Sequence, residues 1–153
     1  MRLSDWDAMI AELGARGHCI KESGAFLLAN IDGDPRLISR VVYFDDLDPK
    51  CLKGGIHFDG RAYSKLWDVC KNEKCKVVGD VHTHPGTQVR QSIIDAANPM
   101  IAQKGHIALI LPDLGCHSIA RYEVGIHRYD GGNWTSWTGR EAKKRISLRR
   151  RFP

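Results

Sequence analysis

The chain has 153 residues, of which 42% are hydrophobic and 27% charged, a composition typical of one soluble globular domain. Its apolar runs fall far short of the roughly 20 residues that span a bilayer, and acids near its start exclude the apolar core of a signal peptide, so we expect a cytoplasmic protein without a membrane segment. The net charge of +5 comes from the end of the chain, because residues 1–138 carry 16 bases and 17 acids and are nearly neutral.

The first predicted element is an amphipathic helix that Ser4 caps and that ends at Gly14 and Gly17. An almost continuous apolar run over residues 22–31 predicts a strand that is covered on both faces. The turn-forming sequence DGDP then leads to a returning strand over residues 36–44.

The middle of the chain begins with residues 51–58, a candidate third strand. Asp59 is placed to cap a helix over residues 60–73. Its expected inner face consists of Tyr63, Leu66, Trp67 and Cys70. A strand over residues 76–84 and a loop over residues 85–91 follow.

The second half continues with a short helix from Ser92, disturbed at Pro99, and a buried strand over residues 106–111. Residues 118–130 alternate like a half-exposed strand, and the GGN turn leads from it into WTSW as a hairpin. Hairpins and strand–helix–strand connections both occur, so the pattern predicts an α/β (α+β) domain with a mixed sheet.

The last 15 residues contain seven bases and one acid and carry +6. We therefore divide the chain into a main domain over residues 1–138 and a basic C-terminal tail over residues 139–153. The tail could touch nucleic acid or an acidic partner, or it could be a solvated, frayed end. Because no aromatic platform is interleaved with its bases, we expect no functional nucleic-acid partner.

Five cysteines occur at irregular spacings: Cys19, Cys51, Cys70, Cys75 and Cys116. In the absence of a secretion signal we expect all five to be reduced thiols, most of them buried. A metal site at Cys70 and Cys75 would need two further ligands that the pattern does not supply.

The sequence VHTHP places His82 and His84 on one face at the end of a strand, since alternate residues of a strand share a face. Their nitrogens suit Zn2+, Fe2+, Ni2+ or Cu2+. A catalytic zinc site usually has a third protein ligand, for which Asp95, in the first turn of the next helix, is the candidate. Ser92 lies three residues earlier and faces the same way. The alternative that these residues bind no metal is also open, because Ser92 and Asp95 match a capping box and paired histidines can lie exposed at a strand end.

The segment HTHPGTQVRQSIID resembles the signature of the JAMM metalloproteases, the catalytic class of MPN domains, which reads H-[ST]-H-P, six residues, S-x-x-D. The fixed positions are filled by His82, Thr83, His84, Pro85, Ser92 and Asp95. The family also has a glutamate at the start of an early strand, and KESGAFLLAN offers Glu22, although alanines stand at two positions where the family often has glycine. The segment GHIALILPD is similar to compact bacterial members.

The resemblance implies a cytidine-deaminase-like domain whose mixed, curved sheet is flanked by helices. It implies one Zn2+ held by His82, His84 and Asp95, and an enzyme that hydrolyses an amide bond. Glu22 would then be the general base and Ser92 a hydrogen-bond donor to the oxyanion. Without a metal partner, Glu22 could instead pair with a lysine such as Lys21 on the surface.

Substrates of this family are mostly amide or isopeptide bonds at the C-terminus of ubiquitin-like proteins, and the chain lacks room for the large insertions of animal members. By analogy we expect a bacterial-type peptidase or isopeptidase that processes or removes a ubiquitin-like protein. E1-like and E2-like proteins are candidate partners, and an antiphage-defence operon is a candidate setting. One alternative is a peptidase that releases a sulfur-carrier protein. Alternatives of another class are a non-catalytic MPN scaffold and a nucleic-acid-associated protein that uses the tail.

Asp80 precedes the two histidines and could orient one of them from behind the metal, or it could face solvent. The histidines outside the motif have no partner pattern and are expected to be ordinary polar or core residues: His18, His57, His106, His117 and His127. Trp134 and Trp137 are expected to pack on the sheet, or to line a protein-binding surface.

Overall fold

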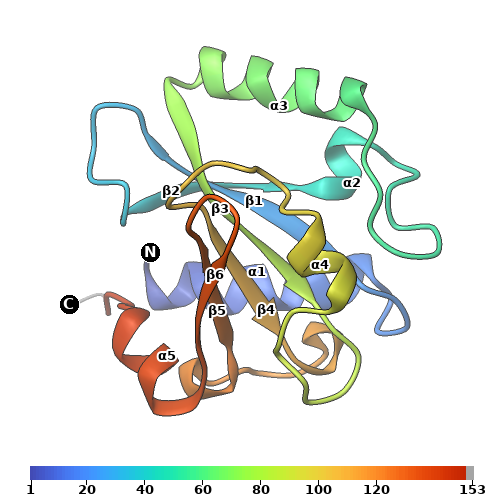
Figure 1. Ribbon diagram of the computed structural model, residues 1–153, viewed down its shortest axis with the longest axis vertical. Helices are drawn as coiled ribbons and strands as arrows, with labels where there is room; N and C mark the ends of the chain where they lie inside the picture. The colour runs from blue at the N-terminus through green and yellow to red at the C-terminus, as the bar shows by residue number, and fades with distance from the viewer. Residues whose placement is uncertain (151–153) are drawn as a thin grey trace.

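The computed structural model describes residues 1–150, which form one mixed six-stranded sheet with helices on both faces (Figure 1). The strand order is β2-β1-β3-β4-β5-β6. Only β3 and β4 are parallel. The strands are β1 (Gly24–Asn30), β2 (Ile38–Tyr43), β3 (Cys75–Thr83), β4 (Ile107–Leu111), β5 (Gly125–Tyr129) and β6 (Trp134–Trp137). The predicted α+β class with a mixed sheet is confirmed.

The helices of the described chain are α1 (Leu3–Arg16), α2 (Phe44–Leu47), α3 (Gly60–Asn72), α4 (Ile93–Ala97) and α5 (Gly139–Arg145), with 3-10 turns η1 (Asp113–Gly115) and η2 (Arg121–Glu123). Within residues 1–150, none of the helices is both long and apolar enough to cross a membrane.

The sheet separates two hydrophobic cores because successive side chains of a strand point to opposite faces. Leu27 of β1 and Val81 of β3 pack against α1 on one face. Phe26 and Leu28 of β1 pack with Leu66 of α3 on the other. Strand β1 is therefore buried on both faces, which confirms the prediction from its continuous apolar run.

The helix boundaries follow the predicted pattern with one clear error. Asp59 caps α3 as expected, because its carboxylate accepts hydrogen bonds from the backbone N–H of Arg61 and Ala62. The prediction that Ser4 caps α1 is wrong: the helix begins at Leu3, and Arg2 is its N-cap without a side-chain hydrogen bond.

Three further expectations fail for local reasons. Residues 51–55 form turns and bends and residues 56–58 are irregular, so no strand forms; Gly54 and Gly55 adopt φ of 73° and 115°, outside the strand region. Trp67 lies on the outer side of α3, where it is 49% exposed. The strand expected from residue 118 begins only at Gly125, after the 3-10 turn η2.

The start of the basic tail is folded onto the rest of the chain. Residues 139–145 form α5, whose Ala142 is fully buried against the α1 side of the sheet. Arg149 forms a parallel β-bridge with Arg2. The tail runs on to residues 151–153, which lie outside the described residues, and its separation from the main domain stays a prediction.

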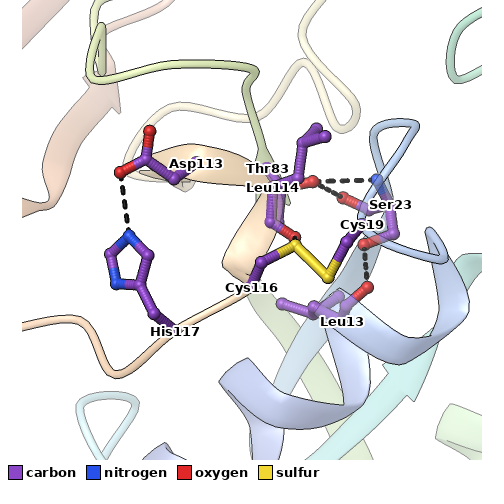
Figure 2. Close-up of a disulfide and its surroundings, with 8 residues drawn as sticks. All are labelled: Leu13, Cys19, Ser23, Thr83, Asp113, Leu114, Cys116 and His117. Carbon is purple, nitrogen blue, oxygen red and sulfur yellow. Dashed lines mark hydrogen bonds and ion pairs between the residues drawn. A yellow bond between two sulfur atoms is a disulfide. The ribbon is translucent and has the colours of Figure 1, made fainter.

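Cys19 and Cys116 form a disulfide, so the expectation that all five cysteines are reduced is wrong for this pair (Figure 2). The two residues are 97 positions apart, yet their Cα atoms lie 5.6 Å from each other. The contact arises because the loop after α1 meets the end of η1, two segments whose proximity no local pattern reports. Cys51, Cys70 and Cys75 are free thiols.

Candidate metal centre

Three side chains converge where β3 ends, with their ligand atoms all within 4.8 Å of one another: His82, His84 and Asp95. The Nε2 atoms of the two histidines are 3.0 Å apart. Oδ2 of Asp95 lies 3.2 Å from Nε2 of His84 and 3.8 Å from Nε2 of His82. The long loop after Pro85 and the first turn of α4 bring the carboxylate back over the strand end.

These distances fit a shared ion. Ligands at about 2.0–2.1 Å in tetrahedral geometry lie about 3.3 Å from one another, and the three separations observed bracket that value. Two imidazole nitrogens with one carboxylate oxygen form a set that suits zinc and leaves a fourth position open. His82, His84 and Asp95 therefore form a group that could hold a metal ion.

The charges around the three side chains favour a cation. Burial opposes ionisation of both His82 and Asp95, but the neighbouring groups of opposite charge outweigh it. Asp80 and Asp95 raise the pKa of His82 to about 9. The two histidines and Ser92 hold the pKa of Asp95 well below its usual range. Asp80 and Asp95 thus both face His82. Because the site is partly shielded from water, the negative charge of these carboxylates is weakly screened and attracts a cation.

Backbone contacts hold the histidines in place. His82 pairs across the sheet with Gly24 of β1, where a Cβ would collide with the ring of Phe44. The N–H of His84 donates to the carbonyl of Leu111 at 2.9 Å, and the carbonyl of His84 accepts from the N–H of Leu114 at 2.9 Å. The end of β3 is therefore fixed by β1, β4 and η1.

The disulfide lies directly beside this strand end. In Figure 2 the Cys19–Cys116 bond is next to Ser23 and Thr83. Thr83 follows His82 and points to the opposite face. Its Oγ1 accepts a hydrogen bond from the N–H of Ser23 at 3.0 Å, and Ser23 Oγ donates to the carbonyl of Leu13 at 2.7 Å. Ser23 adjoins Glu22, so the segment that carries this glutamate is tied to both β3 and α1.

The loop between the second histidine and α4 is anchored by β5. Nε2 of His127 donates to the carbonyl of Val89 at 2.9 Å, and Nδ1 lies 2.7 Å from Oγ of Ser136. Gly125 lies against the same carbonyl, where a Cβ would collide with the Val89 oxygen. This contact sets the path by which the chain carries Asp95 to the histidines. His127 was expected to be an ordinary histidine, and nothing in its local sequence signals the contact.

Ser92 and Asp95 form the capping box that the spacing allows. Ser92 N–H donates to Asp95 Oδ2 at 2.8 Å, and Asp95 N–H donates to Ser92 Oγ at 3.1 Å. The same carboxylate oxygen faces both histidines, so capping of α4 and a place in the metal group are compatible. The hydroxyl of Ser92 accepts from Asp95, which leaves its own hydrogen free for another acceptor.

Glu22 and Ser92 lie on the wall of one cavity of about 550 Å3 that also includes His82 and Asp95. The rest of the wall is largely apolar or aromatic, with Phe58, Tyr63, Ile94, Met100 and Trp134 among its residues. The structure thus gathers all five residues that the motif singled out in one region: four line the cavity, and His84 contacts two of them. The roles assigned to Glu22 and Ser92 stay predictions.

Asp80 is buried behind His82 with 1% of its surface exposed, so the alternative that it faces solvent is wrong. Its Oδ1 lies 2.6 Å from Nε2 of His106, which is also buried. Burial opposes ionisation, but the two neighbouring histidines lower the pKa of this carboxyl below its usual value. His106 was expected to be an ordinary histidine. Its meeting with Asp80 depends on the parallel register of β3 and β4, which the sequence does not show.

No family model matches this chain. A protein from Desulfitobacterium hafniense, whose structure was determined in solution, aligns over 90% of this chain and 88% of its own with 18% sequence identity and a TM-score of 0.61. That similarity shows a shared fold. A JAB1/MPN domain protein from Archaeoglobus fulgidus aligns over 94% of this chain and 92% of its own, with 16% identity and a TM-score of 0.43.

Proposed function

We propose that the chain is a JAMM-type zinc peptidase that hydrolyses the amide bond at the C-terminus of a ubiquitin-like protein. The observation that carries the proposal is the convergence of His82, His84 and Asp95 next to a cavity that Glu22 and Ser92 also line. The ligand set is the one that the motif assigns, and its separations fit tetrahedral zinc. Zinc, when bound, supplies a Lewis acid for attack on a carbonyl.

Glu22 is proposed as the group that moves the proton. It lies just before β1, half-buried, and its backbone is held through the neighbouring Ser23. A carboxylate on the wall of the cavity can take the proton of an attacking water and return it to the leaving amine. General acid–base catalysis of this kind typically contributes about 10²–10⁴ in rate.

Ser92 is proposed to donate a hydrogen bond to the oxyanion. The capping box orients its oxygen, so the hydroxyl is positioned before substrate enters. Removal of one oxyanion donor typically costs about 10²–10³ in kcat. Its exposed position at the start of α4 leaves the hydroxyl accessible to substrate.

A protein substrate is supported by the apolar surface next to the site. Ile93 and Ile94 follow Ser92 and are 91% and 71% exposed. Helix α4 buries none of its own side chains, so this surface is available to another chain. The choice of a ubiquitin-like protein with an extended C-terminal tail follows from the family resemblance.

The test compares the wild type with Glu22→Gln, and with Glu73→Gln as a matched control on a distant surface ion pair. Zinc per chain is measured for all three proteins, and each is assayed on a ubiquitin-like protein fused or conjugated through its C-terminus. We expect about one zinc in every protein, cleavage by the wild type and Glu73→Gln, and a loss of about 10²-fold or more for Glu22→Gln.

Two results would contradict the proposal in different ways. Wild-type protein that binds zinc but cleaves neither a fusion nor a conjugate would leave the metal site and remove the substrate assignment. Absence of zinc binding by the wild type would refute the assignment as a zinc peptidase. Cleavage by Glu22→Gln at the wild-type rate would show that another group moves the proton.

A further inference from the structure

We propose that Asp80 and His106 together position His82 as a ligand, by holding the proton of His82 on Nδ1 so that Nε2 faces the metal. The inference rests on the proposed metal site and deepens it. His106 does not line the cavity, and Asp80, which does, is only 1% exposed. Both are therefore proposed to act through His82, as positioning residues.

The carboxylate of Asp80 is buried in the sheet layer beside His82. Asp80 is on β3, two residues before His82, so both side chains point to the same face of the sheet. It is 1% exposed, in a layer that otherwise packs Phe26 and Leu28. Burial of a carboxylate in such surroundings costs several kcal/mol unless hydrogen bonds compensate it.

One oxygen of Asp80 has such a partner. Oδ1 lies 2.6 Å from Nε2 of His106, whose side chain is 2% exposed. A carboxylate can only accept here, so Nε2 of His106 carries the hydrogen. His106 itself is fixed through its backbone, where its N–H donates to Gln103 and its carbonyl accepts from Tyr129. The carboxylate is therefore anchored from the residue that precedes β4.

The other oxygen is aimed at the metal ligand. Oδ2 of Asp80 is the one buried side-chain nitrogen or oxygen atom within residues 1–150 that has no hydrogen-bond partner. It lies 3.6 Å from Nδ1 of His82, about half an ångström beyond an ordinary N–H···O bond. A small rotation of the imidazole toward Asp80 would close this contact and satisfy the buried oxygen.

The chemistry of imidazole makes this contact consequential. A neutral imidazole has one N–H and one lone pair, and only the nitrogen with the lone pair can bind a metal. Nε2 of His82 faces His84 and Asp95. Binding through Nε2 requires the hydrogen on Nδ1, and an acceptor fixed at Nδ1 favours that tautomer.

The decisive variant is Asp80→Asn. With its oxygen still accepting from His106, the new amide would present N–H to Nδ1 of His82, which favours the opposite tautomer and leaves Nε2 protonated. Asp113→Asn is the matched control, since Asp113 forms a comparable pair with His117 at 2.8 Å on the surface. His106→Gln retains a donor for Oδ1, whereas His106→Leu removes it.

The first readout is zinc affinity, measured by competition with a chromogenic chelator in the absence of substrate. We expect Asp80→Asn to weaken binding by about 10–100-fold. His106→Leu should weaken it in the same direction, with recovery in His106→Gln and no change in Asp113→Asn. Wild-type affinity in folded Asp80→Asn would overturn the inference. Should that variant not fold, equal affinity in His106→Leu and His106→Gln would overturn it.

The second readout needs no metal. At alkaline pH, nitrogen NMR reports which ring nitrogen of the neutral imidazole of His82 carries the hydrogen. We expect Nδ1 in the wild type and a shift toward Nε2 in Asp80→Asn; the Nε2 tautomer in the wild type would overturn the inference. Absence of zinc binding by the wild type would instead contradict the proposed function, and the tautomer measurement would still decide the role of Asp80.

Discussion

Replacement of both Cys19 and Cys116 by serine should lower the free energy of unfolding by about 2–4 kcal/mol. The bond joins residues 97 positions apart, so it closes a loop of nearly two-thirds of the chain. It also joins the segment before Glu22 to the segment after η1, beside Thr83 at the end of β3 (Figure 2).

The magnitude follows from the size of this loop. In the chain-entropy treatment, a crosslink over about 100 residues removes conformational freedom from the unfolded chain that is worth about 4.7 kcal/mol at 25 °C. Measured effects of native disulfides usually fall below that limit, because unfolded chains retain some structure. With a urea dependence of about 2 kcal/mol per molar, the middle of the usual range, the loss should lower the unfolding midpoint by about 1–2 M.

The assay is urea unfolding followed by tryptophan fluorescence, for the wild type and the double variant, each with and without a reductant. Reductant should move the wild-type midpoint to that of the variant and leave the variant unchanged. Zinc binding should persist in the variant, because the hydrogen bond from Leu114 to the carbonyl of His84 does not pass through the sulfurs. Equal midpoints for the wild type and the double variant without reductant would refute the reasoning. So would free thiols at Cys19 and Cys116 in the purified wild type.

Three further outcomes are expected. Asp95→Asn should weaken zinc binding by more than about 100-fold in chelator competition, since the loss of a ligand charge exceeds the effect of a supporting residue. Burial raises the pKa of Cys51 to about 12 and of Cys70 to about 11. At pH 8 both thiols should therefore be alkylated at least about 100-fold more slowly than a free cysteine, and the rates should rise about tenfold per pH unit as thiolate forms. Alkylation rates that mass spectrometry finds comparable to that of a free cysteine would contradict this. Gly125→Ala should destabilise the fold by about 1–3 kcal/mol in urea unfolding, because the added methyl meets the carbonyl of Val89.

Elements with a strong local pattern could be predicted from the sequence. The apolar run of β1 and the Asp59 cap of α3 both appear where expected, because each depends on neighbours within one strand or one turn. Residues 51–58 and the cap of α1 were predicted wrongly, since the same short patterns are compatible with turns or with an uncapped start. Helix α5 was not predicted at all, because its bases hide the single buried alanine that packs on the sheet.

The candidate site divides in the same way. The sequence by itself determined which side chains are candidate ligands, from their types. It also determined the shared face of His82 and His84, because a strand alternates with period two. It also determined the capping box that orients Asp95, because that box lies within one helical turn.

Only the tertiary structure decided what surrounds those residues. Asp80 meets His106 through the parallel register of β3 and β4, and His127 of β5 holds Val89 in the loop before α4. Cys19 meets Cys116 across 97 positions of the chain. Each of these contacts joins segments far apart in sequence, so its geometry depends on how the whole sheet is assembled. Neither segment therefore shows a sequence pattern that indicates the contact.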